Sequence, residues 1–276
     1  MKALPTLPNR QLVSFVIPAM NQQDALEPLF KGIRHSMRAS GYDWEIIFID
    51  DGSTDSTWSV MQELSYRDAR HITSYKLPAH QGKDDALALG FEVAGGDIIF
   101  TMDAGLQAGP EDIPRFLSAI EQGSDIAIGW KSECGDSNHR AWFTTVCTAV
   151  LNLMTSATLH GHAFGYKACT KEVIKSLPMC DNHQVASAIA SQQGFRITDV
   201  EVSHQTLGSG VVLGGVERSV IGACKVIASI ARQRHVSRND HSRHFTVEET
   251  VNGFLDHPFI LVTMQPTSPS NILEAA

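Results

Sequence analysis

The sequence lacks a basic excess, a paired-cysteine motif and a long apolar segment. Its 276 residues carry 22 Lys and Arg against 30 Asp and Glu, a formal net charge of −8. An acidic chain of this kind argues against nucleic acid as a partner, because binding phosphates requires a basic surface. The five cysteines include no CxxC pair, so neither a metal knuckle nor a disulfide framework is predicted. We expect all five to be small packing residues in a reducing compartment.

The sequence also shows no apolar segment typical of a membrane span or of a secretory signal peptide. The longest uncharged run, residues 141–166, is interrupted by repeated threonines, whereas a span needs about 20 mainly apolar residues. No continuous apolar segment of a signal peptide precedes Leu12. We therefore expect a cytoplasmic protein. Apolar stripes in 140–156 and 217–231 leave core packing, a homo-oligomer and peripheral contact with the inner face of a membrane open.

Short apolar runs alternate with longer amphipathic segments through the first half of the chain. This rhythm is typical of βαβ units and predicts an α/β fold with a mostly parallel central sheet and helices on both faces. Strands are expected at 12–17, 45–49, 71–77, 97–102 and 124–128, and helices near 24–39, 55–68, 82–94 and 111–122.

The rhythm changes after Gly129. Helices are expected near 140–156, 182–193 and 217–231, and strands near 163–168 and 195–203. We interpret these elements as a helical elaboration of one domain, residues 1–235, followed by a partly loose C-terminal extension, residues 236–276.

Carboxylates close two of the predicted parallel strands. Asp50 and Asp51 follow one strand and Asp103 follows another, and ligands of open parallel sheets bind where the strands end. An acidic edge would repel a nucleotide phosphate unless a divalent cation lay between them. The glycine-rich GxGxxG and GxxxxGK[ST] loops are absent, which argues against dinucleotide-dependent dehydrogenases and P-loop proteins.

Four ordered motifs carry a resemblance to a known family. They are Ser14–Asn21 (SFVIPAMN), Ile49–Asp55 (IDDGSTD), Gly82-Lys83 at a helix start, and Gly95–Gln107 (GGDIIFTMDAGLQ). Together they resemble family 2 glycosyltransferases of GT-A fold, a Rossmann-like α/β architecture. Within that family the chain is most similar to the polyprenyl-phosphate hexose transferases, the dolichol-phosphate mannose synthase group.

This resemblance implies an inverting transfer of a hexose from a UDP- or GDP-sugar to a polyprenyl phosphate or another acceptor, with Mg²⁺ or Mn²⁺ as cofactor. It implies catalytic roles for Asp103, Lys131 and Arg140, and metal contacts for Asp103 and Gln107. The substrate-binding positions that it implies are Pro18, Met20, Gln22, Ile49, Asp51, Lys83, Ala104 and His204.

Several positions depart from the pattern of that family. Gly105 stands where the second Asp of an Asp-x-Asp metal motif is usual, Met20 replaces an aromatic residue and Gln22 replaces Glu. The acceptor-side loop 205–212 contains no Lys or Arg. Losing a carboxylate should weaken a site for a hard divalent cation.

These departures keep three interpretations open: a metal-dependent transferase, a transferase with altered or metal-independent chemistry, and an inactive homologue that acts as a binding or regulatory partner. A nucleotidyltransferase would also need two metal carboxylates and gains no support.

Overall fold

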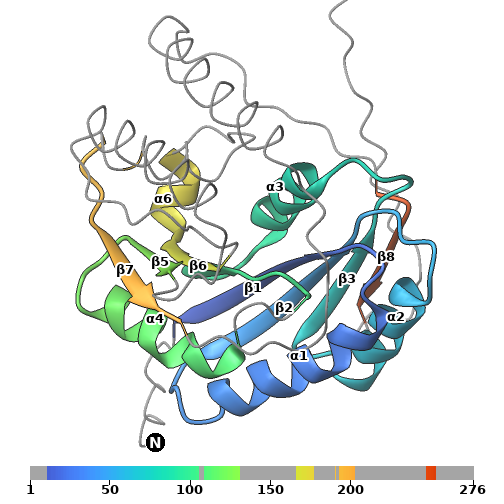
Figure 1. The fold of residues 1–276 in the computed structure, drawn as a ribbon, viewed down its shortest axis with the longest axis horizontal. Coiled ribbons are helices and arrows are strands. Elements are labelled where there is room, and N and C mark those ends of the chain that lie inside the picture. The colour runs from blue at the N-terminus through green and yellow to red at the C-terminus, as the bar shows by residue number, and fades with distance from the viewer. Residues whose placement is uncertain are drawn as a thin grey trace, which may run out of the picture.

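The computed structural model describes residues 11–105, 109–130, 166–176, 190, 193–202 and 247–252. The described strands form one eight-stranded sheet (Figure 1). In chain order they are β1 (Leu12–Ala19), β2 (Asp43–Asp50), β3 (Ile72–Lys76), β4 (Ile98–Thr101), β5 (Ile126–Trp130), β6 (Lys167–Thr170), β7 (Ile197–Glu201) and β8 (Glu249–Asn252).

The strands lie in the order β7-β5-β6-β4-β1-β2-β3-β8. β1 pairs in parallel with β2 and β4, β2 with β3, and β5 with β7. β6 runs antiparallel between β4 and β5, and β8 runs antiparallel to β3. The sheet is therefore mostly parallel, and the carboxyl ends of β4, β1, β2 and β3 meet at one edge.

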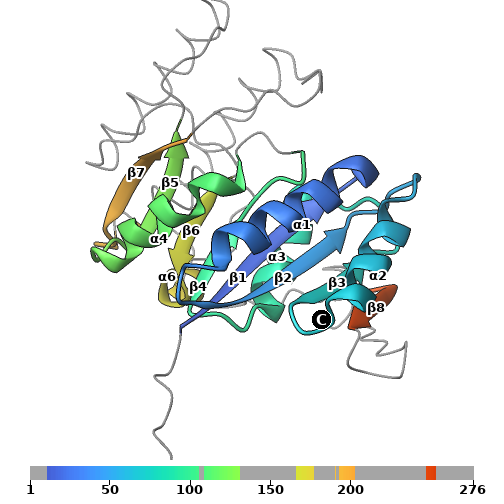
Figure 2. The ribbon, with the colours of Figure 1, turned by 90° about the horizontal axis from the view of Figure 1, so that it is seen from below.

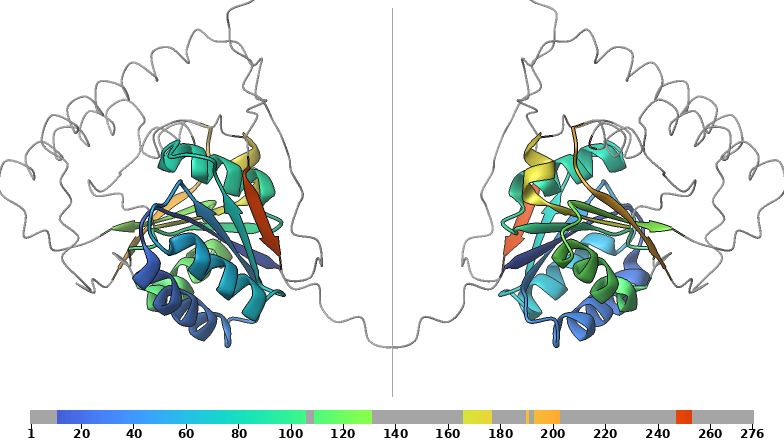
Figure 3. Two further views of the ribbon diagram at one scale, coloured as in Figure 1. Left: turned by 90° about the vertical axis from the view of Figure 1, so that its right-hand side faces the viewer. Right: turned by 90° about the vertical axis from the view of Figure 1, so that its left-hand side faces the viewer.

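Helices cover both faces of the sheet (Figures 2 and 3). One face carries α1 (Gln23–Met37), α2 (Thr57–Arg67) and α4 (Ile113–Glu121), with the short 3-10 turn Pro110–Asp112 before α4. The other face carries α3 (Lys83–Val93) and α6 (Lys171–Ser176).

Two hydrophobic cores follow from the alternation of side chains along each strand. In β1, Phe15 and Ile17 belong to the core on the side of α1, and Val16 belongs to the core under α3. Helix α3 lies very close to the sheet at Gly90, where an added Cβ would stand 2.2 Å from Val16 Cγ1 and 2.9 Å from Ile49 Cδ1.

The predicted fold class is confirmed, with the first five strands and first four helices close to the expected positions. The strand expected near 163–168 is instead Lys167–Thr170, and its antiparallel direction was not foreseen. The strand expected near 195–203 is Ile197–Glu201. Helices expected near 140–156 and 217–231 lie outside the described residues, and so does most of the one expected near 182–193.

Strand β8 comes from the stretch that the sequence analysis assigned to the C-terminal extension. Its Glu249 carboxylate accepts hydrogen bonds from Trp58 Nε1 at 2.9 Å and Gln62 Nε2 at 2.8 Å, both on α2. Lys76 in β3 forms an ion pair with Glu248, 3.2 Å between Nζ and Oε2. Polar side-chain contacts thus hold this short strand at the edge of the sheet.

Within the described ranges, no helix is long and apolar enough to cross a bilayer. Of the cysteines, the structure describes Cys169, which is a free, buried thiol in β6. Burial raises the pKa of this thiol to about 12, which fits the expectation of a packing residue for this position.

Candidate active site

The four motif segments meet at the carboxyl edge of β4, β1, β2 and β3. The turn after β1 carries Met20 and Gln22, and the turn after β2 carries Asp51. The loop after β3 leads to Lys83 at the start of α3, and Asp103 follows β4 by two residues. Segments that are far apart in the sequence are thereby assembled into one candidate site (Figure 1).

The turns after β1 and β2 are bonded to each other. Asn21, which has a positive φ of 53°, donates its backbone N–H to Ser53 Oγ at 2.9 Å, and its side-chain oxygen accepts the Thr54 backbone N–H at 2.9 Å. The Gln22 backbone N–H donates to Thr57 Oγ1 at 2.8 Å. This network fixes the turn that presents Met20, whose side chain is exposed.

The two adjacent aspartates after β2 have different roles. Asp50 Oδ1 accepts the Ser53 backbone N–H at 3.1 Å, while its Oδ2 has no hydrogen-bond partner among the described residues. Burial raises the pKa of Asp50. Asp51 instead turns to the loop before α3, where its carboxylate accepts the backbone N–H groups of Gln81 at 2.7 Å and Gly82 at 3.1 Å.

The Asp51 carboxylate also contacts an imidazole, because Oδ2 lies 2.8 Å from His80 Nδ1. The close packing of this loop requires a glycine beside Asp51. Gly52 has a φ of +73°, and an added Cβ would stand 2.5 Å from the His80 backbone nitrogen. Asp51 is therefore the anchor of the loop that places Lys83.

Lys83 and Asp103 form an ion pair across the edge, with the ammonium donating to Asp103 Oδ1. Both side chains are partly open to solvent, 43% for Lys83 and 32% for Asp103. The carboxylate expected to face a metal is thus paired with a lysine that the resemblance had placed among the substrate contacts.

Gly105 and Gln22 are neighbours in space. A Cβ built on Gly105 would have a single near contact, Gln22 Oε1 at 3.7 Å, which is an ordinary van der Waals distance. Among the described residues, nothing obstructs a Cβ at the position where the family motif has its second aspartate. Two departures that look independent in the sequence lie together at the same point of the site.

Among the residues that the structure describes, few side-chain oxygens are grouped for a divalent cation. Hard cations take several oxygen ligands, mainly carboxylates. Here one carboxylate, Asp103, is paired with an ammonium group, and Gly105 offers no side-chain oxygen. Within the described part of the chain, no group of three or more His, Cys, Asp and Glu residues could hold a metal ion.

Lys167 is a functional candidate that the sequence analysis missed. It lies in β6 opposite Thr101 of β4 and is buried, with 8% of its surface exposed. Burial is the main cause that lowers the pKa of Lys167 to about 8, and the charge of Lys83 lowers it further. A lysine within a short strand gave no sequence signal, since strands at a protein surface commonly carry lysine.

Three other implied substrate positions are occupied by buried side chains. Pro18 and Ile49 lie opposite each other in β1 and β2, and Ile49 belongs to the core under α3. Ala104 is 2% exposed and packs into the opposite core. Their side chains support the edge. The implied residues Gln107, Lys131, Arg140 and His204, and the loop 205–212, lie outside the described residues.

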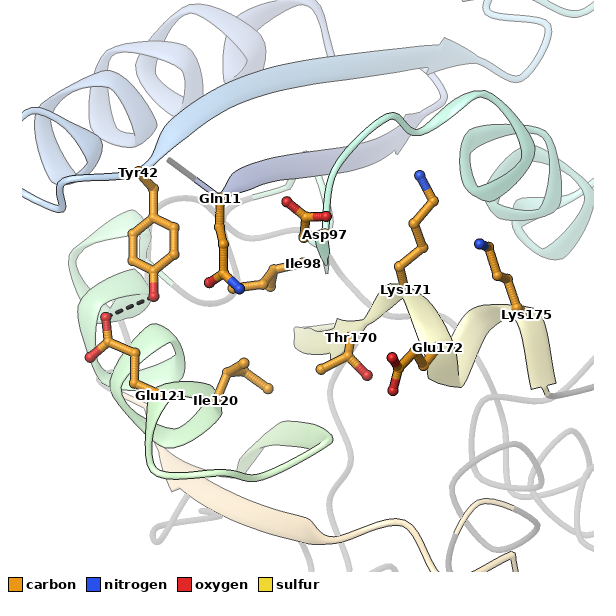
Figure 4. A pocket seen from close by; sticks show the side chains of 10 residues that line it. All are labelled: Gln11, Tyr42, Asp97, Ile98, Ile120, Glu121, Thr170, Lys171, Glu172 and Lys175. Atoms are coloured by element: carbon orange, nitrogen blue, oxygen red, sulfur yellow. Dashed lines mark hydrogen bonds between the residues drawn. The ribbon is translucent and has the colours of Figure 1, made fainter. Parts of the chain in front are cut away.

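A cavity of about 700 Å³ lies at the opposite edge of the sheet (Figure 4). Gln11 and Asp97, which precede β1 and β4, line it together with residues of α4 and α6. Tyr42 donates its hydroxyl to Glu121 at 2.7 Å on one side, and Lys171 stands on the other. This cavity lies at the amino ends of β1 and β4, whereas Asp51, Lys83 and Asp103 lie at the opposite edge.

The family model for "Glycosyl transferase family 2" matches residues 14–177. Two similar curated proteins are both undecaprenyl-phosphate 4-deoxy-4-formamido-L-arabinose transferases. The one from Edwardsiella ictaluri (strain 93-146) is 29% identical over 195 residues, 70% of this chain and 60% of that protein. The one from Salmonella newport (strain SL254) is 30% identical over 193 residues, 70% of this chain and 59% of that protein. The chain thus spans about 60% of the length of these relatives.

Solved structures share the fold. Glucosyl-3-phosphoglycerate synthase from Mycobacterium tuberculosis, in complex with Mn²⁺, UDP and phosphoglyceric acid, superposes with a TM-score of 0.58 at 17% identity, covering 83% of this chain and 80% of that one. A complex of the same enzyme with Mg²⁺ and UDP gives the same TM-score.

Proposed function

The chain belongs to glycosyl transferase family 2, and from this premise we propose that it transfers a sugar from a nucleoside-diphosphate sugar to a lipid phosphate, with inversion. One observation carries the proposal: the motif segments converge at the carboxyl edge of β4, β1, β2 and β3, where this kind of sheet binds its ligands. The similar curated proteins are named as transferases, so an inactive homologue is not favoured.

The donor and acceptor are inferred from the chemistry of the similar proteins. The structural neighbour binds UDP at this fold, which supports a UDP- or GDP-sugar here. The names of the curated relatives contain undecaprenyl phosphate, which supports a polyprenyl-phosphate acceptor and a peripheral contact with the membrane that carries it.

The reaction needs little proton transfer. An oxygen of the acceptor phosphate attacks the anomeric carbon, the bond from that carbon to the donor diphosphate breaks, and the diphosphate leaves with the electron pair. The acceptor phosphate is already ionised, so no general base is required. The remaining tasks are to align the reactants and to neutralise the charge that develops on the diphosphate.

The described residues are suited to the first task. The bonds from Asn21 to Ser53 and Thr54 hold the turn after β1, and the bonds from Asp51 to the loop 80–82 hold the start of α3. Fixed turns at strand ends can position a donor without reorganisation during the reaction.

A divalent cation would neutralise the leaving diphosphate where it is bound. The structural neighbours were crystallised with Mn²⁺ or Mg²⁺. In this chain we propose that the metal site is weakened, because Gly105 lacks a ligand and Asp103 is paired with Lys83.

A transfer assay tests this function. The protein is incubated with labelled UDP- or GDP-sugars and vesicles that contain polyprenyl phosphate, and labelled lipid is extracted and counted. We expect labelled lipid with at least one donor. Asp103→Asn should reduce its formation at least about tenfold, whereas the matched control Asp43→Asn, an exposed residue at the opposite edge of the sheet, should not. The proposal fails if folded protein labels no lipid with any donor.

A further inference from the structure

Strand β8 begins at the edge of the sheet that carries the candidate site. Because β8 runs antiparallel to β3, its first residue, Glu249, pairs with Lys76, which is the last residue of β3. The chain leaves β3 at this point and enters the loop before α3. A segment that is far from the four motifs in the sequence thus lies beside the strand that leads to Lys83 (Figure 1).

The residue before β8 is bonded to the point where the chain leaves β3. Glu248 donates its backbone N–H to the Lys76 carbonyl oxygen at 2.7 Å. The next residue, Leu77, donates its backbone N–H to the Asp50 carbonyl oxygen at 2.9 Å. The start of the loop is therefore held between β8 and β2. The ion pair between Lys76 and Glu248 is partly exposed, so it adds little to this attachment.

Val247 attaches the same segment to the core. Its side chain is 6% exposed and belongs to the core under α3. Leu77 at the start of the loop and Leu87 of α3 belong to the same core, and both are buried. An apolar side chain from the C-terminal part of the chain therefore helps to fill the core beneath the helix that Lys83 begins.

Helix α2 holds β8 from the other side. The Glu249 carboxylate accepts the Trp58 Nε1–H and Gln62 Nε2–H groups described above. Trp58 is half-buried and packs against the core on the side of α1. The start of β8 is thus attached to both cores of the domain, which fixes the position of Val247 and Glu248.

The loop between β3 and α3 transmits this position to the site. Its far end is held by Asp51, which accepts the backbone N–H groups of Gln81 and Gly82. The next residue, Lys83, pairs with Asp103. A short loop that is fixed at both ends restricts the position of the residue that follows it, so loosening its start should also loosen Lys83.

We propose that Val247, Glu248 and Glu249 are positioning residues for the candidate donor site, because they hold the exit of β3 and, through the loop 77–82, place Lys83 opposite Asp103. This inference rests on the proposed function for the ligand that the site takes. The three residues act through the loop, and the role requires no contact between them and the ligand.

Hydrogen exchange of the Gln81 and Gly82 backbone N–H groups tests the structural step without a ligand. Val247→Ala creates a cavity at the start of β8 and should speed exchange of both groups at least about fivefold. Val173→Ala is the matched control, because Val173 is 1% exposed and belongs to the same core but lies in α6. Both variants should lower the thermal unfolding temperature, whereas exchange at Gln81 and Gly82 should be unchanged in Val173→Ala.

Calorimetric titration with UDP and with GDP, each in Mn²⁺, tests the step to the ligand. For a nucleotide that the unmodified protein binds, Val247→Ala should weaken the affinity at least about threefold, because the site is less well preorganised. Val173→Ala should keep the affinity of the unmodified protein. A merely structural role of Val247 would lower the stability and leave the affinity for nucleotide unchanged.

A second variant tests the proposal outside the core under α3, should Val247→Ala fail to fold. Trp58→Phe removes the Nε1–H donor to Glu249 and should speed exchange at Gln81 and Gly82 at least about twofold. Its control is Trp44→Phe, because Trp44 stacks on His71 at the amino end of β2, away from the site. That variant should leave exchange at Gln81 and Gly82 unchanged.

The outcomes separate this inference from the proposed function. Unchanged exchange at Gln81 and Gly82 in Val247→Ala and Trp58→Phe would overturn the inference, and so would equal increases in the two control variants. Faster exchange with an unchanged affinity for a nucleotide that binds would overturn the positioning role. Faster exchange in a protein that binds neither UDP nor GDP would support the coupling of β8 to the loop and reject the proposed function.

Discussion

The buried Lys167 should make the stability of the fold depend on pH in the alkaline range. Desolvation, with a smaller contribution from Lys83, lowers the pKa of this ammonium from 10.5 to about 8. Above pH 8 the folded protein has released a proton that the unfolded chain still binds. The free energy of unfolding should therefore rise with pH until the unfolded lysine titrates near 10.5.

The size of the effect follows from the shift. A difference of one bound proton between the unfolded and folded states changes the free energy of unfolding by about 1.4 kcal/mol per pH unit. Because the pKa of Lys167 in the folded protein is about 8, the free energy of unfolding should rise by about 1 kcal/mol between about pH 8 and 9. Cys169 acts in the opposite sense at higher pH, because burial raises its pKa from 9.0 to about 12 and the folded state keeps the proton. The interval from about pH 8 to 9 therefore isolates Lys167 best.

The assay is urea unfolding followed by circular dichroism at about pH 7, 8 and 9. The free energy of unfolding of the unmodified protein, minus that of Lys167→Met, should increase by about 1 kcal/mol between about pH 8 and 9. The exposed control Lys31→Met should follow the unmodified protein at every pH. A difference between unmodified protein and Lys167→Met that does not vary with pH would refute a buried, titrating lysine at this position.

Three other substitutions test the site. Gly105→Asp places a Cβ that meets only Gln22 Oε1, at 3.7 Å, and adds a carboxylate where the family motif has one. It should raise the affinity for UDP in Mn²⁺ at least about tenfold in calorimetry, with little change in EDTA. An unchanged affinity in Mn²⁺ would mean that Gly105 does not adjoin the metal position. Asp51→Ala removes the acceptor of two backbone N–H groups. In urea titrations it should lower the free energy of unfolding by about 3 kcal/mol, and a loss below about 1 kcal/mol would contradict the anchoring role of Asp51. Gly52→Ala should lower the free energy of unfolding by more than Gly41→Ala does. Both glycines have a positive φ, but of the two only Gly52 brings an added Cβ against the His80 backbone. Backbone strain alone should cost about 1 to 2 kcal/mol at Gly41, and equal losses in the two variants would exclude the close approach at Gly52.

Sequence patterns predicted the parallel core of the sheet well, because its strands are continuous apolar runs that end at polar turns. The strand β8 left no such signal. Its four residues Glu-Thr-Val-Asn are short and mostly polar, and the contacts of Glu249 with α2 place them. The antiparallel direction of β6 likewise depends on how the chain returns to the sheet, which no local pattern encodes.

The sequence predicted which strand ends lie side by side, but not the contacts between the residues that follow them. Asp51, Lys83 and Asp103 do meet at one edge, as adjacent parallel strands require. The pairing of Lys83 with Asp103 and the adjacency of Gly105 to Gln22 join residues about 20 and 80 positions apart. Such pairs arise only from tertiary packing, and the burial of Lys167 between β4 and β5 is of the same kind.

The most direct test of the central claim is calorimetric titration of the folded protein with UDP-sugars and GDP-sugars, each with Mn²⁺ and with EDTA. Saturable binding of at least one donor, weakened in Lys83→Met and unchanged in Lys31→Met, is the result that a nucleoside-diphosphate-sugar site at this edge predicts. Absence of binding for every donor under both conditions would contradict the assignment of this edge as a donor site.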